Sequence, residues 1–279
     1  MTRQDRSAGA MEPDSGPGQP VVSRDGAPLP SGITSARLGL GRAGSALPTS
    51  AVLAFDMAHA LARDAVHDAL DRDALASTLG AFGLDIIQVD SAAPDRATYL
   101  RRPDFGRRLS RESRSVLAAR PRVPANIVLV VADGLSATAA KLNARPLLDA
   151  LIPLLRINGR SIGSIVLANQ GRVALGDEIG ALLGARMVVV LIGERPGLSA
   201  ADSLGAYLTL DPKIGRNDAE RNCVSNIRAG GLDPDQAAST LARLIERALT
   251  LGRTGVELKD DTARPDGSLP KEVPRLCPS

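Results

Sequence analysis

Aromatic side chains are scarce in this 279-residue chain, which has no Trp, two Tyr and three Phe. A surface that stacks nucleic-acid bases needs exposed aromatic rings, so this scarcity argues against such a surface. The chain is nevertheless 44% hydrophobic, so its core must consist of Leu, Val, Ile and Ala. This composition is typical of a globular protein, and we expect no nucleic-acid partner.

Cysteine and histidine are scarce as well. Cys223 and Cys277 have neither a CxxC spacing nor a nearby histidine, so the sequence predicts no zinc site and no disulfide framework. His59 and His67 are two turns apart on one predicted helix, where they cannot share a metal ion as an i, i+4 pair does. We therefore expect no metal ligands in this chain, and we interpret both histidines as structural or partner-contacting residues.

Long apolar runs and blocks of like charge are also missing. No run reaches the roughly 18 residues of a membrane-spanning helix, and the N-terminus lacks the apolar segment of a secretory signal. The 34 basic and 31 acidic residues are interleaved, so the net charge of +3 includes no basic block of the kind that binds nucleic acids or membranes. The sequence predicts a cytoplasmic protein with no membrane contact.

Composition divides the chain into four parts. Residues 1–34 are rich in Gly, Pro, Ser and charge, and are expected to be a disordered tail because they cannot bury enough apolar surface. Residues 259–279 are polar and contain proline, which predicts a loose tail. Between the tails we expect an N-terminal helical region over 35–120 and an α/β domain over 121–258.

Apolar periodicity locates the elements of these regions. Helices are predicted over 49–70 and 71–82, followed by a short strand at 84–90 and a helix N-capped by Ser110. Further along, the predicted strands are 126–133, 161–169, 186–193 and 205–212, and the predicted helices are 136–159, 174–185 and 233–252. Pro146 is expected to break the first of these helices or to start a second one. This alternation predicts the α/β class, with a parallel sheet and helices on both faces.

Polar, glycine-containing segments follow the predicted strands. They are DGLS (133–136), NQGRV (169–173), GERPG (193–197) and RNCVSNIR (221–228). Ligands of such sheets bind outside the carboxyl ends of the strands, so we expect these segments to gather at one edge. Asp133 and Ser136 are explained by a turn with a helix N-cap. Glu194 and Arg195 are either ligand contacts or an exposed pair, and Cys223 is either functional or a small buried residue.

The segment GLGRAG (39–44) matches the G-x-G-x-x-G pattern of dinucleotide-binding folds. That pattern requires a strand before it and a helix opening directly from it. Here the preceding SGITSAR is a poor strand, and Pro48 separates the glycines from the next predicted helix. A glycine-rich turn is the favoured interpretation, and a nucleotide-binding oxidoreductase subunit of the Rossmann type is kept as the alternative.

Several longer motifs, taken in order, resemble the small subunit of ethanolamine ammonia-lyase. They are ARLGLGRAGSALPTSAVLAFDMAHALARDAVH, YLRRPDFGRRLS, VVADGLSA, NQGRVALGDEIGALLGARMVVVLIGERPGLSAADSLGAYLT and AERNCVSNIRAGGL. The resemblance runs from about residue 35 to residue 258. It implies a lyase that uses adenosylcobalamin to convert ethanolamine into acetaldehyde and ammonia by a radical route. A large TIM-barrel subunit would hold the substrate and the catalytic side chains, leaving no catalytic residue in this chain.

The same resemblance implies how this chain takes part. A Rossmann-like domain, preceded by N-terminal helices, would close over the cobalamin at the interface between the subunits of a hetero-oligomer. By similarity, the cobalamin contacts fall on Val173, Glu194 and Cys223, each of which keeps the residue type of the family. The chain lacks the D-x-H-x-x-G motif that offers a histidine to cobalt, so the cobalamin is expected to be base-on.

The sequence leaves two alternatives for the location of the protein in the cell. Some members of the family begin with a short amphipathic helix that directs them into a bacterial microcompartment. Residues 1–34 lack that pattern. The cytoplasm is the expected location, with a microcompartment as the alternative.

Overall fold

The computed structural model describes residues 37–122 and 125–258. Both predicted tails, residues 1–34 and 259–279, lie outside the described residues. The chain divides into two compact units, Met1–Ala60 and Leu61–Ser279. The first unit contains most of helix α1 (Thr49–His67), which confirms a helix predicted there. None of the described helices is long and apolar enough to cross a bilayer.

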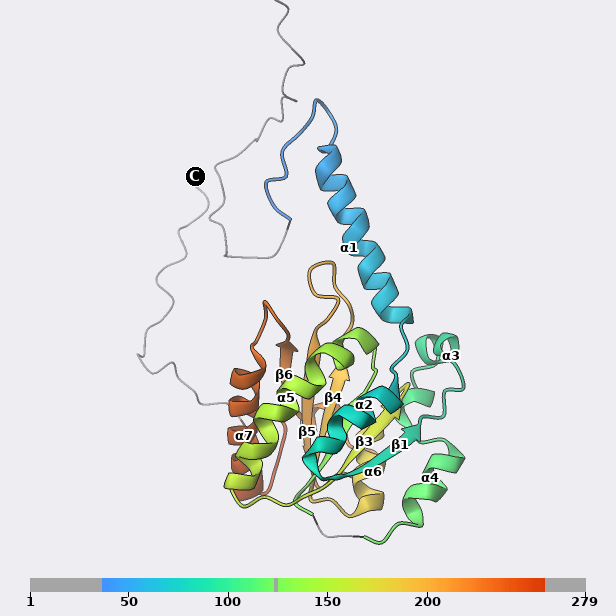
Figure 1. Ribbon diagram of the computed structural model, residues 1–279, viewed down its shortest axis with the longest axis vertical. Coiled ribbons are helices and arrows are strands. Elements are labelled where there is room, and N and C mark those ends of the chain that lie inside the picture. Colours follow the sequence, from blue (N-terminus) through green and yellow to red (C-terminus); the bar gives the residue numbers. More distant parts are fainter. Residues whose placement is uncertain (1–36, 123–124, 259–279) are drawn as a thin grey trace, which may run out of the picture. The chain divides into compact units, whose positions relative to one another are not determined.

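The second unit is built on a six-stranded sheet with the strand order β1-β3-β2-β4-β5-β6 (Figure 1). The strands are β1 (Asp85–Asp90), β2 (Ile127–Ala132), β3 (Ile162–Asn169), β4 (Met187–Gly193), β5 (Leu204–Leu210) and β6 (Asn222–Ile227). Strands β1, β3, β2 and β4 are mutually parallel, which confirms the α/β class.

The last two strands correct the expectation of an entirely parallel sheet. β5 runs antiparallel to β4, and β6 runs antiparallel to β5. Residues 194–203 are too few for a crossover, which needs a dozen or more residues, so β4 and β5 form a hairpin instead. As a consequence, the end of β6 returns to the edge of the sheet where β4 ends.

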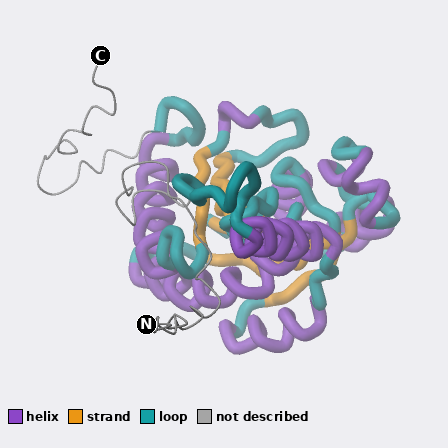
Figure 2. Tube along the Cα trace, turned by 90° about the horizontal axis from the view of Figure 1, so that it is seen from above, coloured by secondary structure: helices purple, strands orange, loops and turns teal. Residues whose placement is uncertain are grey.

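Helices cover both faces of the sheet. The helices are α2 (Arg72–Leu79), α3 (Arg96–Arg101), α4 (Arg111–Ala118), α5 (Ala137–Ile157), α6 (Leu175–Leu183) and α7 (Pro234–Leu251). Helices α2, α5 and α7 pack on one face, and α4 and α6 pack on the other. Seen from above in Figure 2, the strands accordingly lie between helices on either side. Single 3₁₀ turns occur at Gly80–Phe82, Phe105–Arg107 and Asp218–Glu220.

Helix α5 is continuous, so the predicted break at Pro146 is wrong. Both Pro146 and Pro153 lie inside it and on its exposed side. A proline frees the carbonyl oxygen four residues earlier. Those carbonyls belong to Leu142 and Asp149, which are exposed, so water can bond them. The opposite side of α5 is buried against the sheet and α7, and this burial offsets the cost of the prolines.

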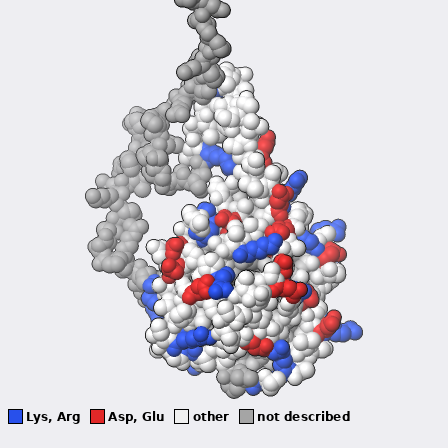
Figure 3. Space-filling model, viewed as in Figure 1, with Lys and Arg blue, Asp and Glu red and all other residues white. Residues whose placement is uncertain are grey.

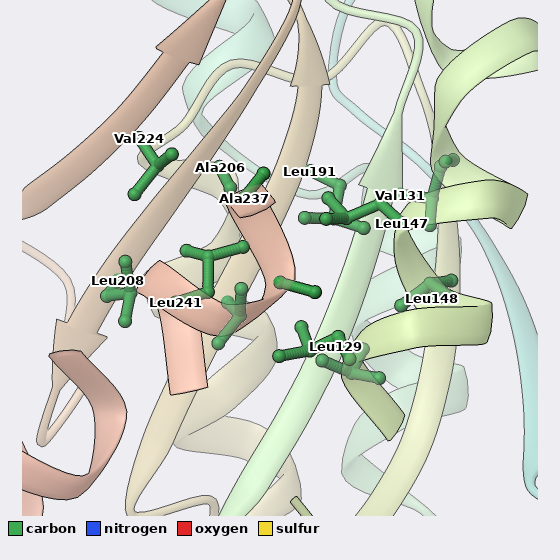
Figure 4. Packing of buried hydrophobic residues seen from close by; sticks show 14 of the residues in the cluster. Leu129, Val131, Leu147, Leu148, Leu191, Ala206, Leu208, Val224, Ala237 and Leu241 are labelled. Atoms are coloured by element: carbon green, nitrogen blue, oxygen red, sulfur yellow. The ribbon is translucent and has the colours of Figure 1, made fainter. Parts of the chain in front are cut away.

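The core is aliphatic, as the composition predicts. On the face covered by α5 and α7, side chains from the strands meet those of the two helices: Leu129, Val131, Leu191, Ala206, Leu208, Val224, Leu147, Leu148, Ala237 and Leu241 (Figure 4). Val128, Val130, Val188 and Val190 point to the other face, where Leu117 and Ile179 cover them. The continuous apolar runs of β2 and β4 are thus explained by burial on both faces.

Three elements differ from the sequence-based expectation. Helix α3 and strand β6 were not predicted, and β1 belongs to the main sheet through its parallel pairing with β3. β6 lies within RNCVSNIR, where polar residues dominate: in this strand only Val224 and Ile227 are buried, three residues apart, and its pairing with β5 has a register shift. The domain boundary at residue 120 stays a prediction. β1 precedes this boundary but pairs with β3 in the sheet of the α/β domain.

Close backbone contact at Gly193 makes a side chain intolerable there. A Cβ added at Gly193 would lie 2.0 Å from the Ser136 carbonyl oxygen and 2.5 Å from that of Asp133. We expect Gly193→Ala to lower the free energy of unfolding of the full chain by about 1–3 kcal/mol, since overpacking against backbone has that cost.

Gly197→Ala is the matched control, because nothing lies within 4 Å of a Cβ at Gly197. Denaturant unfolding of the two variants and the unmodified chain measures the difference. Equal stability of Gly193→Ala and Gly197→Ala would contradict the packing shown here.

Candidate functional site

The polar segments that follow the strands do gather at one edge of the sheet. We call this edge the rim, and it comprises residues 133–136, 170–174, 194–203 and 225–228. The loops after β2, β3 and β4 reach it from parallel strands, and β6 reaches it through the hairpin. The rim is therefore assembled from four separate stretches of chain.

Ser136 and Asp133 fix the first of these loops. Ser136 is the N-cap of α5: its Oγ accepts a hydrogen bond from the Ala139 amide at 3.1 Å and donates one to the Ala201 carbonyl at 2.7 Å. The N-cap interpretation of Ser136 is thus confirmed. The hydroxyl also ties the β2 loop to the hairpin between β4 and β5.

The carboxylate of Asp133 ties the β2 loop to the β3 loop. Its Oδ1 accepts from the Gly171 amide at 3.2 Å, and its Oδ2 lies 3.5 Å from Nη1 of Arg96. The side chain is only 5% exposed. Burial raises the pKa of the Asp133 carboxyl, opposed by backbone hydrogen bonds and by Arg96. Arg96 also donates to the Gly134 carbonyl at 2.8 Å, which anchors the same loop.

The loop after β3 has an unusual backbone at its first residue. Gln170 has φ +55, a left-handed conformation that costs about 1–3 kcal/mol in a residue other than glycine. Its buried Oε1 has no hydrogen-bond partner. The next residue, Gly171, accepts a 3.0 Å hydrogen bond from the buried Tyr99 hydroxyl. Burial raises the pKa of Tyr99, so this hydroxyl is a permanent donor.

A pocket of about 290 Å³ opens at the rim. Its lining consists of Tyr99, Leu135, Arg172, Val173, Ile192, Gly193, Glu194, Arg195 and Tyr207. Two of the three predicted contact residues, Val173 and Glu194, therefore face the same pocket although they come from different loops. The third, Cys223, lies opposite Tyr207 in the register of β5 and β6. The structure brings the three positions into one neighbourhood, while their contact with cobalamin stays a prediction.

Glu194 bonds extensively within the chain. Its carboxylate accepts hydrogen bonds from Ser203 Oγ at 2.5 Å, Ser225 Oγ at 2.7 Å and the backbone amide of Asn226 at 3.2 Å. Gly205 makes room for it, because a Cβ there would lie 2.9 Å from Glu194 Oε1. The exposed-pair interpretation with Arg195 is thus wrong for Glu194, which instead fastens the end of β4 to the end of β6.

Cys223 is the free cysteine of the described residues, and it is exposed on the edge strand β6. Partial desolvation and the Glu194 carboxylate raise the pKa of its thiol, against a hydrogen bond with Tyr207. Burial likewise raises the pKa of Tyr207, and Cys223 and Glu194 raise it further. A thiol with a raised pKa is protonated at neutral pH and is a poor nucleophile.

The histidines and the glycine-rich motif belong to α1 and to the segment that precedes it. His59 and His67 are exposed on α1, and the described residues contain no group of three or more His, Cys, Asp or Glu side chains suited to a metal ion. In GLGRAG, Ala43 pairs with Ala46 in a tight turn, and α1 begins only at Thr49. Because no helix opens directly from the glycines, the motif lacks the helix that the dinucleotide-binding pattern requires.

Two residues that line the pocket, Tyr99 and Arg172, were missed as site residues by sequence reasoning. The Arg172 guanidinium stacks on the Tyr99 ring, 4.2 Å from its centroid. The sequence offers one signal, the rarity of tyrosine in this chain, but it does not show which of the two tyrosines is buried.

Comparison with known proteins shows the family of this chain. A family model described as the ethanolamine ammonia-lyase light chain (EutC) matches residues 30–259. The chain belongs to this family. It is 53% identical over 232 residues to a Bradyrhizobium diazoefficiens protein named ethanolamine ammonia-lyase small subunit, covering 83% of this chain and 89% of the relative.

Two further relatives carry the same name. The chain is 53% identical over 230 residues to the Rhodopseudomonas palustris protein, covering 82% of this chain and 88% of the relative. It is 52% identical over 241 residues to the Azotobacter vinelandii protein, covering 85% and 89%. The resemblance expected from the motifs is confirmed, and the chain is a small subunit of an ethanolamine ammonia-lyase.

The bonding of Glu194 predicts a local effect of its removal. We expect Glu194→Ala to speed hydrogen exchange at the Asn226 amide and to lower the free energy of unfolding by roughly 1–3 kcal/mol, because it removes an ionised acceptor from three donors. Arg195→Ala, an exposed neighbour on the same loop, is the control. Unchanged exchange at Asn226 would show that the carboxylate does not hold β6.

Proposed function

We propose that this small subunit binds adenosylcobalamin at its rim, at the interface with a large catalytic subunit, for the conversion of ethanolamine to acetaldehyde and ammonia. The observation that carries the proposal is the placement of Val173 and Glu194 on one pocket at the carboxyl ends of the parallel strands, with Cys223 next to the pocket residue Tyr207. Ligands of α/β folds bind at this edge of the sheet.

The chemistry of the rim suits a corrin. The corrin ring is surrounded by acetamide and propionamide groups, which both donate and accept hydrogen bonds. Two buried polar atoms of the loop after β3, Gln170 Oε1 and Arg172 Nε, have no partner among the described residues, and Arg172 lines the pocket. Buried polar atoms are nearly always hydrogen-bonded, so an unpartnered guanidinium at a pocket favours a polar ligand.

The chain's part is binding rather than bond-breaking. When bound, adenosylcobalamin supplies the radical chemistry, and the protein supplies binding and orientation. The Cys223 thiol is protonated, the Tyr207 hydroxyl keeps its proton, and both histidines lie on α1. We accordingly assign the substrate site and the catalytic side chains to the large subunit, and we place the hetero-oligomer in the cytoplasm.

This division of labour predicts that the purified chain has no ammonia-lyase activity by itself. Mixing it with its large subunit and adenosylcobalamin should restore turnover. Acetaldehyde formation, followed with a coupled alcohol dehydrogenase, is the measurement. Each subunit alone with cobalamin is the control, and robust turnover by the small subunit alone would refute the assignment.

The cobalamin is expected to keep its own base as the lower cobalt ligand. The motif that supplies a protein histidine is missing, and His59 and His67 belong to the helix α1. Electron spin resonance of the cob(II)alamin form, in a complex whose small subunit carries ¹⁵N-histidine, should show no change in nitrogen coupling. A coupling that changes with this label would place a histidine of this chain on cobalt.

A further inference from the structure

Arg172 is held in a fixed position at the rim although no carboxylate of the described residues pairs with it. Arg172 is half-buried, whereas the one fully buried arginine of the described residues, Arg221, is neutralised by a two-fold hydrogen-bonded pair with Asp177 at 2.6 and 2.7 Å. The contacts of Arg172 are instead the Tyr99 ring and the Tyr99 carbonyl, to which Nη2 donates at 3.3 Å. Its charge is therefore not balanced by an ion pair within the described chain.

The surroundings of Arg172 fix its orientation before any ligand arrives. Tyr99 is fully buried and forms a flat support for the guanidinium. The Arg172 amide donates to the Gly106 carbonyl at 2.8 Å. A Cβ on Gly106 would lie 2.8 Å from Arg172 Cγ and 2.9 Å from the Tyr99 ring, so this glycine lets the stack form. A side chain that is already ordered loses little entropy when it binds.

The guanidinium retains unused donors. A guanidinium has five N–H donors. Nη2 of Arg172 makes the bond to Tyr99, Nε is buried without a partner, and Nη1 has none among the described residues. Because Arg172 lines the pocket, an acceptor that enters the pocket can use Nη1 and the second N–H of Nη2.

The charge around the pocket favours an anion. Its charged lining residues are Arg172, Glu194 and Arg195, an excess of one positive charge. The Glu194 oxygens are already bonded to Ser203 and to β6. The ion pair of Arg96 with Asp133 adds no net charge. Elsewhere on the face of the second unit seen in Figure 3, basic and acidic side chains are interspersed.

Resting on the proposed function, we propose that Arg172 binds the phosphodiester in the nucleotide loop of cobalamin. The amide groups of the corrin are neutral, whereas this phosphodiester is a monoanion with two free oxygens. A guanidinium presents two parallel N–H groups to such a pair of oxygens, which a lysine does not. Arg172 thus distinguishes a complete cobalamin from a corrinoid that lacks the nucleotide loop.

The test compares two corrinoids on the complete complex of both subunits. Cyanocobalamin has the phosphodiester, and dicyanocobinamide has the corrin and its amides without it. Binding is followed by the change in corrin absorbance, which does not require turnover. We expect Arg172→Gln to weaken cyanocobalamin binding about 10- to 150-fold, the effect of losing a hydrogen bond to a charged group, and to change cobinamide binding less than about threefold.

Two further variants separate position from charge. Arg172→Lys keeps the charge without the paired N–H groups, so it should give an intermediate loss confined to cyanocobalamin. Arg195→Gln removes the same charge from an exposed position on the pocket, so it should weaken cyanocobalamin binding far less than Arg172→Gln does and leave cobinamide binding nearly unchanged. An equal loss of cyanocobalamin binding in Arg195→Gln and Arg172→Gln would show that only the overall positive charge of the pocket matters, and it would overturn the inference.

The remaining outcomes are also decisive. Equal weakening of both corrinoids by Arg172→Gln and by Arg172→Lys would mean that Arg172 only shapes the pocket, which overturns its assignment to the phosphodiester while leaving the proposed function intact. An unmodified complex that binds neither corrinoid would instead overturn the proposed function, and this inference with it. Should Arg172→Gln fail to assemble, Arg172→Lys alone decides between a selective and a uniform loss.

Discussion

The rim depends on the close approach of two backbone segments, the loop after β2 and the end of β4. The Leu135 amide donates to the Gly193 carbonyl at 2.9 Å, and a Cβ on Gly134 would lie 2.2 Å from that same oxygen. Glycines at both positions permit this approach. Because Ser136 then reaches the β4–β5 hairpin and Asp133 reaches the β3 loop, three loops become one rigid surface.

Acidic and basic side chains at the rim have different roles. Carboxylates face inward: Asp133 joins the β2 and β3 loops, and Glu194 joins β4 to β6. Arg172 and Arg195 line the pocket without carboxylate partners among the described residues. The acids therefore hold the scaffold together, and the positive charge that remains is available to a ligand, which is the arrangement expected of a preorganised binding site.

The sequence predicted the elements whose signal is local. The apolar runs of β2 and β4 and the helix predicted over 233–252 are local signals, and all are confirmed. The break predicted at Pro146 was wrong because the cost of a proline in a helix depends on whether it lies on the solvent-exposed side, as Pro146 does in α5. Strand β6 was missed because its polar residues bond to Glu194, a partner 31 residues away in the case of Ser225. Tyr99 and Arg172 were missed for the same reason: their stack is a tertiary contact.

The internal bonds of Glu194 limit what it can give to a cofactor. An ionised carboxylate has about four acceptor sites. Three are used by Ser203, Ser225 and the Asn226 amide, so about one remains for a corrin amide. Arg172, by contrast, spends one N–H on the Tyr99 carbonyl and keeps the others. On the proposed function, Glu194 would act mainly by holding the end of β6 beside the pocket, and Arg172 would supply the larger direct share of binding.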